Sequence, residues 1–471
     1  MYRMSRREVR GSISIFLALT ITIMLSFCMV LIESARENAM LLKADLVFDT
    51  GMRCLMAEYH QKLWEEYDLL YVDCSYGSSV PGYGKVKSHL QFYIEENLKY
   101  DTSGWFSLKY QESRMSEVLL ATDTGCSDFY RQAVEAAEAS VGISYIEQAL
   151  SWLEQVESTR YVSEFIESDS RKTEEAIEGV NGTVVEVKEA VWGVDRKGQA
   201  VLLEDAEYET VDISNPLDQI LSGNILLTQV VGEFSDISSN RIDISALVSN
   251  LNLVVGSNDD SDSTNGIWKK ALFCKYVLDH FDSFMDRNSS AEDGLVYPLE
   301  YLIGGRPADA QNMEIVAAEL LVIREIDNYL KLLQDEVKCA EADAIGAAAA
   351  SLVPWVGPIV TQGVLIYWAY EESVADLQKL FRGEEVPLIK SAGEEFFYEN
   401  SLKYEDYLYL LLLMQGRDEL TIRAMDMIEA DIREEQSDFR MDACIGYAAF
   451  SGVFVDIYGK KYTITNKMKY Y

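Results

Sequence analysis

Histidine is scarce in this chain, and the short motifs of common catalytic sites are missing. Its 471 residues include only His60, His89 and His280, which are too far apart to share a helix face, and no H-E-x-x-H motif is present. No G-x-S-x-G motif occurs, and "PGYGKVK" is not a phosphate loop because no Ser or Thr follows Gly84 and Lys85. Among 78 acidic residues, no carboxylate pair stands out as a glycosidase dyad. We therefore predict a non-enzymatic protein without a cofactor.

Cysteine is also infrequent, with seven residues in the whole chain. Cys28 lies in the longest N-terminal apolar run, and the other six are widely scattered without C-x-x-C spacing: Cys54, Cys74, Cys126, Cys274, Cys339 and Cys444. This is too little cysteine for a scaffold held by disulfides, and no metal site follows from the spacing. Three disulfides and buried free thiols both remain open.

Basic residues are outnumbered, 41 against 78 acidic residues, which gives a net charge of −37. Residues 1–32 contain four Arg and one Glu, or +3, so the remainder carries −40. Such an excess repels phosphate backbones and anionic lipid. The composition argues against a nucleic-acid partner. It also argues against electrostatic binding of the large acidic part to a membrane surface.

Residues Ser12 to Ile32 form an uncharged run of twenty-one residues, long enough to cross a hydrocarbon core of about 30 Å as a helix. A cleaved signal has a shorter apolar core and a small-x-small cleavage site, which is absent after Glu33. The segment before the run is basic, with one Glu against Arg3, Arg6, Arg7 and Arg10. We predict a retained single-pass anchor in the cell membrane, contacting lipid, with residues 1–11 as a cytoplasmic tail and the C-terminal bulk extracellular.

Small residues recur every four positions in this predicted span: Ser14, Ala18, Thr22 and Ser26. This spacing places them along one side of a helix, where small side chains allow close approach of a second membrane helix. Two interpretations are open. The stripe is a helix-packing surface, or Ser and Thr are simply tolerated there.

Beyond the span, the pattern is typical of an α+β protein that is largely helical with small sheets. Helical spacing continues past residue 33 as a stalk that we expect to end near Tyr67. We predict a stalk and first α+β lobe over 33–170, a polar linker over 171–210, and a second, mainly helical α+β lobe over 211–471. In the second lobe, Arg324 and Glu325 are interpreted as structural ion-pair residues.

A second uncharged run covers residues 344–370. Pro354, Gly357 and Pro358 divide it into two pieces, each too short to cross a bilayer. A helical hairpin packed inside the protein, with Trp355, Trp368 and Tyr370 in its core, is favoured over a second membrane segment.

Three further segments carry specific predictions. Alternation from Leu295 to Ile303 predicts a strand, which Pro298 would confine to a sheet edge. Asp260 and Asp262 suggest calcium, but position twelve of the loop lacks a carboxylate, which favours a solvated loop. The chain end, "KKYTITNKMKYY", predicts a terminal hairpin strand with lysines protecting its edge.

The N-terminus resembles those of the TadE/TadG-like pseudopilins of tight-adherence (Flp) pili. The resemblance rests on Gly11 after an arginine, on the apolar helix that follows, and on Glu33 and Arg36 at the end of that helix. Most of the chain is also similar to an uncharacterised family of membrane-anchored proteins that accompany such pili in Gram-positive bacteria. The similar blocks include "AEYHQKLWEEYDLLYVDCSYG", "NPLDQILSGNILL", "LEYLIGGRPAD", "LLVIREIDNYL" and "YWAYEESVADLQKLFRGEEVPLIK".

This resemblance implies a non-catalytic minor pilin-like subunit or an assembly factor, with other pilins or pilus-assembly proteins as partners. It also implies possible processing after Gly11, but Ser14 and Ile15 stand where pilin-like signals often carry a glutamate. The alternatives are a membrane-tethered extracellular enzyme and an adhesin or sensor head of unknown ligand.

Overall fold

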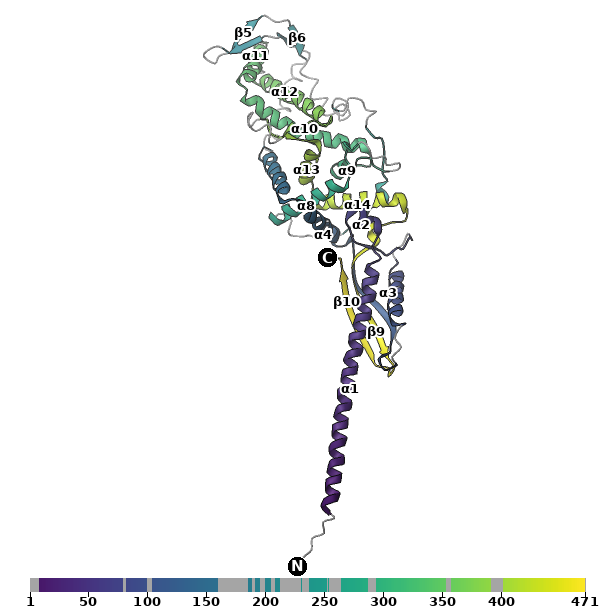
Figure 1. Ribbon diagram of the computed structural model, residues 1–471. Helices are drawn as coiled ribbons and strands as arrows, with labels where there is room; N and C mark the ends of the chain where they lie inside the picture. The colour runs from purple at the N-terminus through teal and green to yellow at the C-terminus, as the bar shows by residue number, and fades with distance from the viewer. Residues whose placement is uncertain are drawn as a thin grey trace, which may run out of the picture. The chain divides into compact units, whose positions relative to one another are not determined.

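The computed structural model places most of the chain in two compact units, which are described separately (Figure 1). It describes residues 8–78, 82–99, 104–159, 237–251, 264–286, 294–352, 357–390 and 401–470, together with four short strands between 185 and 211 and residues 230 and 253. Unit 1 comprises Met1–Asp123 and Gln436–Tyr471, and unit 2 comprises Thr124–Glu435. The predicted α+β fold class, largely helical and with one long apolar helix at the N-terminus, is confirmed.

Unit 1 begins with α1, a single helix over Glu8–Met56. The stalk helix was expected to end near Tyr67, which is wrong, because the chain leaves α1 at Met56 and starts a separate helix, α2, at Gln61–Tyr67. His60 explains the new start, since its backbone is extended and its side chain accepts a hydrogen bond from the Leu63 N–H. Such N-caps favour helix initiation at the following residue.

The sheet of unit 1 is antiparallel and is built around β9, Cys444–Asp456. Its partners are β1 (Val72–Asp73), β2 (Leu108–Leu120) and β10 (Lys461–Lys469), each paired with β9. The predicted terminal hairpin is confirmed, with Lys461 opposite Val455 and Lys469 opposite Tyr447. The 3₁₀ helix η1, Gly104–Phe106, precedes β2.

The core of unit 1 forms where α1 covers this sheet. The second half of α1 contributes Met40, Ala44, Phe48, Met52 and Leu55 to it. Helix α3, Tyr83–Leu98, adds Val86, Leu90 and Ile94, the spacing expected for one helix face. The first half of α1, in contrast, extends beyond the sheet with its apolar side chains exposed (Figure 1).

Unit 2 is mainly helical. Its helices are α4 (Asp123–Ser140), 143–159, α8 (Thr264–His280), α9 (Pro298–Gly304), α10 (Asp309–Gln334), α11 (Glu336–Leu352), α12 (Gly357–Leu380), α13 (Tyr404–Met414) and α14 (Arg417–Glu435). Short 3₁₀ turns lie at Ile244–Ala246 (η3) and Val248–Asn250 (η4). Small two-stranded pairs are β3 (Val185–Lys188) with β6 (Tyr208–Val211), β4 (Val191–Val194) with β5 (Ala200–Glu204), and β7 (Val386–Pro387) with β8 (Ser401–Leu402).

The predicted edge strand over 295–303 is wrong, because these residues start helix α9 at Pro298. Proline is well placed there, since the first helical turn needs no N–H from it and its φ already suits a helix. Gly305 ends the helix in the left-handed region, with φ 62°. Five consecutive buried residues, Leu299 to Ile303, show that the segment is buried all round rather than on alternate sides.

The hairpin predicted for residues 344–370 is confirmed, because α11 and α12 pack against each other. Val360, Val364 and Ala369 of α12 are buried together with Ala342 of α11, and Trp368 packs against this cluster. Among the described helices, α1 is the one long and apolar enough to cross a membrane. Trp355 and the Asp260–Asp262 loop lie outside the described residues.

Candidate functional site

The predicted packing stripe lies on the exposed first half of α1. Ser14, Ala18, Thr22 and Ser26 are all exposed. Thr22 Oγ1 donates to the Ala18 carbonyl over 2.8 Å, and Ser26 Oγ donates to the Thr22 carbonyl over 2.9 Å. Hydroxyls that bond within their own helix leave few unsatisfied polar groups in lipid. The role of the stripe in helix packing, like processing at Gly11, stays a prediction.

Of the two residues at the end of the predicted span, Glu33 and Arg36, Arg36 makes a buried contact between α1 and the sheet, whereas the Glu33 side chain is 52% exposed. Arg36 Nη2 lies 2.9 Å from a carboxylate oxygen of Glu33 and 3.0 Å from Asp456 Oδ2 at the end of β9. The Arg36 side chain is 2% exposed and that of Asp456 0%. The Arg36 guanidinium also lies 4.6 Å from the ring centre of Tyr458, a distance suited to a cation–π contact.

Asp456 organises the turn between β9 and β10 as well as binding Arg36. Its Oδ1 accepts hydrogen bonds from the backbone N–H groups of Tyr458, at 2.9 Å, and Lys460, at 2.8 Å. Burial alone would raise the pKa of Asp456, but these donors and Arg36 hold it below its usual value. The hydrogen bond to Glu33 raises the pKa of Arg36. The pair therefore stays ionised over the physiological range.

Sequence reasoning found Arg36 but missed Asp456, which lies 420 residues away in the chain. A local signal was present, since Asp at a strand end followed by Gly459 is typical of a tight hairpin turn. Nothing local links that turn to α1. The pairing depends on the β9–β10 hairpin lying alongside the helix, with its turn toward the N-terminal end of α1 (Figure 1).

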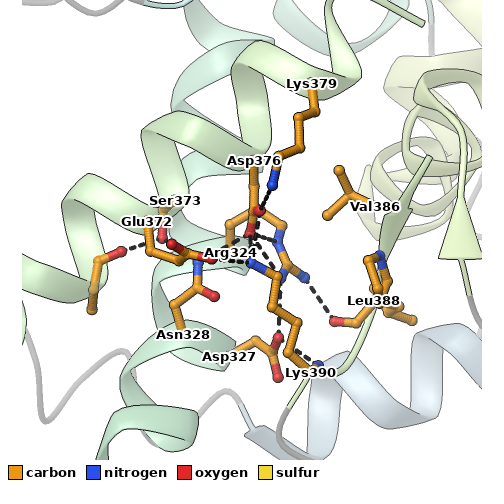
Figure 2. Close-up of polar contacts among 12 residues, drawn as sticks. Arg324, Asp327, Asn328, Glu372, Ser373, Asp376, Lys379, Val386, Leu388 and Lys390 are labelled. Carbon is orange, nitrogen blue, oxygen red and sulfur yellow. Dashed lines mark hydrogen bonds and ion pairs between the residues drawn. The ribbon is translucent and has the colours of Figure 1, made fainter. Parts of the chain in front are cut away.

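Unit 2 contains a buried ionic network around Arg324 of α10 (Figure 2). Arg324 Nη2 lies 3.1 Å from Asp376 of α12 and 3.0 Å from Asp327, and Nη1 donates to the Leu388 carbonyl over 2.8 Å. Lys390 Nζ also contacts Asp376, at 2.6 Å. The network joins α10, α12 and the segment after α12 that contains Leu388 and Lys390.

Three cations and three carboxylates balance one another in this network, because Lys390 also pairs with Glu372 and Lys379 also pairs with Asp376. Burial alone would lower the pKa of Arg324, but Tyr407, Asp376 and Asp327 raise it. Burial alone would raise the pKa of Asp376, but Arg324 and Lys390 hold it below its usual value. Every group is committed to a partner, so the geometry suits a structural joint and not acid–base chemistry. The prediction that Arg324 is a structural ion-pair residue is confirmed.

Glu325, which was predicted to be the second ion-pair residue, differs from Arg324. Burial alone raises the pKa of Glu325 to about 7; no neighbouring charge contributes to this shift. Glu300 of α9 behaves similarly: it is fully buried, accepts hydrogen bonds from the Phe284 N–H and the Tyr404 hydroxyl, and has its pKa raised to about 7 by burial. Among the described residues, no basic side chain contributes to holding either carboxyl ionised.

Each of the three histidines makes its own hydrogen bond, to a different group. His60 caps α2 and lies 3.2 Å from the Gln436 side chain. His89 Nδ1 lies 2.9 Å from Glu58. His280 Nδ1 lies 2.8 Å from the carbonyl of Tyr276, one helical turn earlier. These contacts stabilise local structure and bring no two histidines into one site.

A cavity of about 610 Å³ lies in unit 2 between α4, α8 and α14. Several of its charged lining residues have partners. Arg131 bonds Asp128 and Glu135, Arg417 bonds Asp418, and Lys270 Nζ donates to a backbone carbonyl over 2.6 Å. In this cavity we find no nucleophile placed beside a base.

Within the described part of the chain, no three His, Cys, Asp or Glu side chains are grouped as metal ligands would be. All seven cysteines lie in the described residues and none is in a disulfide; Cys74, Cys126, Cys274 and Cys444 are buried. Burial raises the pKa of the Cys74 thiol to about 11 and that of Cys274 to about 12. Thiols in such surroundings are poor nucleophiles.

These features define an α+β protein with one N-terminal helix able to cross a membrane and an ionic contact that fixes the helix to its sheet. The chain belongs to DUF5702, a family of unknown function, whose model matches residues 206–396 and 393–455, together more than half of the chain. Helix α1 lies outside the matched residues, whereas the Arg324 network lies within them. Neither a curated protein nor a solved structure matches the chain.

Proposed function

We propose that this chain is a non-enzymatic, membrane-anchored subunit or assembly factor of a tight-adherence (Flp-type) pilus or related secretion system. In this proposal the chain is a TadE/TadG-like minor pseudopilin with its N-terminus in the cytoplasm and its bulk outside the cell. Its partners are other pilins or pilus-assembly proteins, which contact the helix alongside membrane lipid.

One observation carries the proposal: α1 is continuous from the apolar segment into the folded core of unit 1. Its first half exposes large apolar side chains such as Phe16 and Phe27, at 69% and 64% exposure, which require lipid or another helix as cover. Its second half is buried, and the Arg36–Asp456 contact fixes it to the sheet. Because the helix is continuous and its second half is fixed to the sheet, the position of its membrane half determines the position of the rest of unit 1.

Site-specific photocrosslinking in cells tests the proposal. A photoreactive amino acid replaces Ala18 in the small-residue stripe, and a matched variant carries it at Phe16. Position 16 lies on nearly the opposite side of the helix, because two residues correspond to about 200° of rotation. We expect position 18 to capture single-span pilins or a pilus-assembly protein, with much weaker capture at position 16. Equal capture of lipid alone at both positions would contradict the proposal.

The N-terminal mass of the chain isolated from cells tests the processing question separately. A retained anchor predicts that the isolated chain still contains residues 1–11, whereas cleavage after Gly11 would give a chain starting at Ser12. Cleavage would remove all four arginines before the span. The processed helix would then be free to leave the bilayer and enter a fibre.

A further inference from the structure

The turn between β9 and β10 displays two apolar side chains on the surface of unit 1. Ile457 is 52% exposed and Tyr458 is 64% exposed. The Asp456 carboxylate holds the turn through the N–H groups of Tyr458 and Lys460, and Gly459 takes a left-handed φ of 79°. The two side chains are therefore presented by an ordered turn.

The depth of this turn relative to α1 follows from its contact with Arg36. Arg36 lies four residues past Ile32, the last residue of the apolar run, which is about 6 Å along the helix axis at 1.5 Å per residue. The polar interfacial layer on each side of a bilayer is about 5–8 Å thick. Tyr458 lies against the Arg36 guanidinium, so it falls at the depth of the headgroups when Ser12–Ile32 spans the membrane.

A second aromatic group lies at the same end of the sheet. Trp105 and Phe106 of η1 are 52% and 36% exposed. Strand β2 follows η1, and its first residue, Leu108, pairs with Asp456. Lys43 of α1 donates a hydrogen bond to the Phe106 carbonyl over 2.9 Å. Lys43 lies eleven residues past Ile32, about 16 Å along the helix axis, so this contact places η1 farther from the span than Tyr458.

Charge at this edge is locally compensated. Glu33 pairs with Arg36, and Glu37 pairs with Lys460. Anionic headgroups would gain little from such a surface, whereas the amphipathic rings of Tyr and Trp favour the boundary between hydrocarbon and water.

We infer that Ile457 and Tyr458 form an interfacial anchor that inserts into the headgroup layer of the membrane crossed by α1. This second attachment restricts the tilt and rotation of unit 1 about its span. The partner is the zwitterionic lipid interface, recognised through apolar and aromatic contact. The inference requires the membrane span but does not depend on the proposed pilus role.

Spin-label accessibility in the full chain tests this inference. Cys28→Ala, Cys54→Ser and Cys339→Ser remove the exposed and half-buried thiols and leave the four buried ones. Single labels are then placed by Ile457→Cys, Tyr458→Cys or Lys469→Cys, and the chain is reconstituted into phosphatidylcholine bilayers. Lys469, exposed at the far end of β10, is about 27 Å from Lys461 at 3.4 Å per residue. A label at Leu25→Cys, inside the span, reports insertion of α1.

Collision rates with oxygen, which concentrates in lipid, and with a water-soluble nickel chelate are compared at each position. We expect the oxygen-to-nickel ratio at 457 and 458 to lie several-fold above that at 469 and below that at 25, without change when anionic lipid is added. A ratio at 457 and 458 equal to that at 469, with 25 in lipid, would overturn the anchor alone. A water-like ratio at 25 would overturn the anchor together with the span on which the proposed function depends.

Discussion

At the scale of single residues, unit 2 buries several charged side chains. Arg324 and Asp376 have side chains with 0% exposure, and Lys390 is 8% exposed. Buried ion pairs recover their desolvation cost only when every charge has a partner at good geometry. Here each carboxylate accepts from at least one cation within 3.1 Å. Removal of one member should therefore cost far more than the pair contributes.

Asp376→Asn tests this reasoning, because it keeps the side-chain shape while leaving Arg324 and Lys390 without their shared carboxylate. We expect the free energy of unfolding of unit 2 to fall by about 3–5 kcal/mol, the usual cost of breaking a buried pair. Guanidinium unfolding of the full chain in detergent measures the change. Glu384→Gln, which removes an exposed carboxylate after α12, is the matched control and should change stability by less than about 0.5 kcal/mol.

The raised pKa of Glu300, about 7, predicts how stability depends on pH. In the unfolded chain this carboxyl ionises near pH 4.5, whereas in the folded chain it keeps its proton up to about pH 7. The contribution of Glu300 to stability should therefore be largest below pH 4.5 and should fall by about 3 kcal/mol as the pH rises to about 7. The raised pKa of Glu325 adds to this loss of stability with rising pH.

Glu300→Gln keeps an oxygen that accepts from Tyr404 and Phe284 but removes the titration. The loss of stability between pH 5 and pH 8 should be smaller in this variant by about 3 kcal/mol. Glu405→Gln, at an exposed position of α13, should keep the full pH dependence. Identical pH profiles for Glu300→Gln and the unmodified chain would show that Glu300 is ionised when folded.

Residue-level prediction from the sequence succeeded for Arg324, because a charged residue in the middle of an apolar helix face must have a partner. Arg36 was named only through the resemblance, and no ionic contact was predicted for it. Their partners, Asp376 and Asp456, lie 52 and 420 residues away. Distances of this kind come from tertiary packing, which no local pattern of a single sequence contains.

At the scale of elements, periodicity predicted most helices of both units. It failed where a short segment is buried on all sides: Leu299–Ile303 is apolar at alternate positions, yet its helix is buried all round, and Pro298 marks a helix start instead of a strand edge. The end of α1 was also missed. Helical spacing continues through Leu63, but the His60 cap divides it into two helices.

Close packing between α1 and β9 gives a third prediction. A Cβ atom on Gly452 would lie 2.5 Å from the Phe48 ring, which is held in the core of unit 1. Gly452→Ala should lower the stability of unit 1 by about 1–3 kcal/mol through overpacking. The matched variant Gly84→Ala, with nothing within 4 Å of the new Cβ at the start of α3, should be neutral or stabilise by up to about 1 kcal/mol. Thermal unfolding of both variants makes the comparison.

At the scale of the whole molecule, chain order and spatial order differ. The predicted lobes were contiguous segments, 33–170 and 211–471. In the structure β9 and β10, from the end of the chain, complete the sheet that packs on α1. Composition shifts along a sequence mark linkers, but they carry no information on which strands pair. Composition shifts therefore cannot reveal that unit 2 is inserted between the two halves of unit 1.

This arrangement predicts that unit 1 cannot form before the chain is complete. β9 is the strand with which β1, β2 and β10 all pair, and it supplies Phe450 and Phe454 to the core beside Phe48. A chain that stops after Glu435 loses this strand and exposes the apolar face of α1 from Met40 to Leu55. We expect hydrogen exchange in α3 and β2 to become fast in this variant, while α10 and α12 of unit 2 keep their protection.

The reciprocal variant joins Asp123 to Gln436 through a short Gly/Ser linker and so removes unit 2. Because every strand that pairs with β9, as well as the Arg36–Asp456 contact, belongs to unit 1, this variant should keep slow exchange in α3, β2 and β9. Slow exchange in β2 of the chain ending at Glu435 would contradict the central role of β9. The two variants together thus separate the folding of unit 1 from that of the larger helical unit, and they decide whether unit 1 depends on residues Gln436–Tyr471.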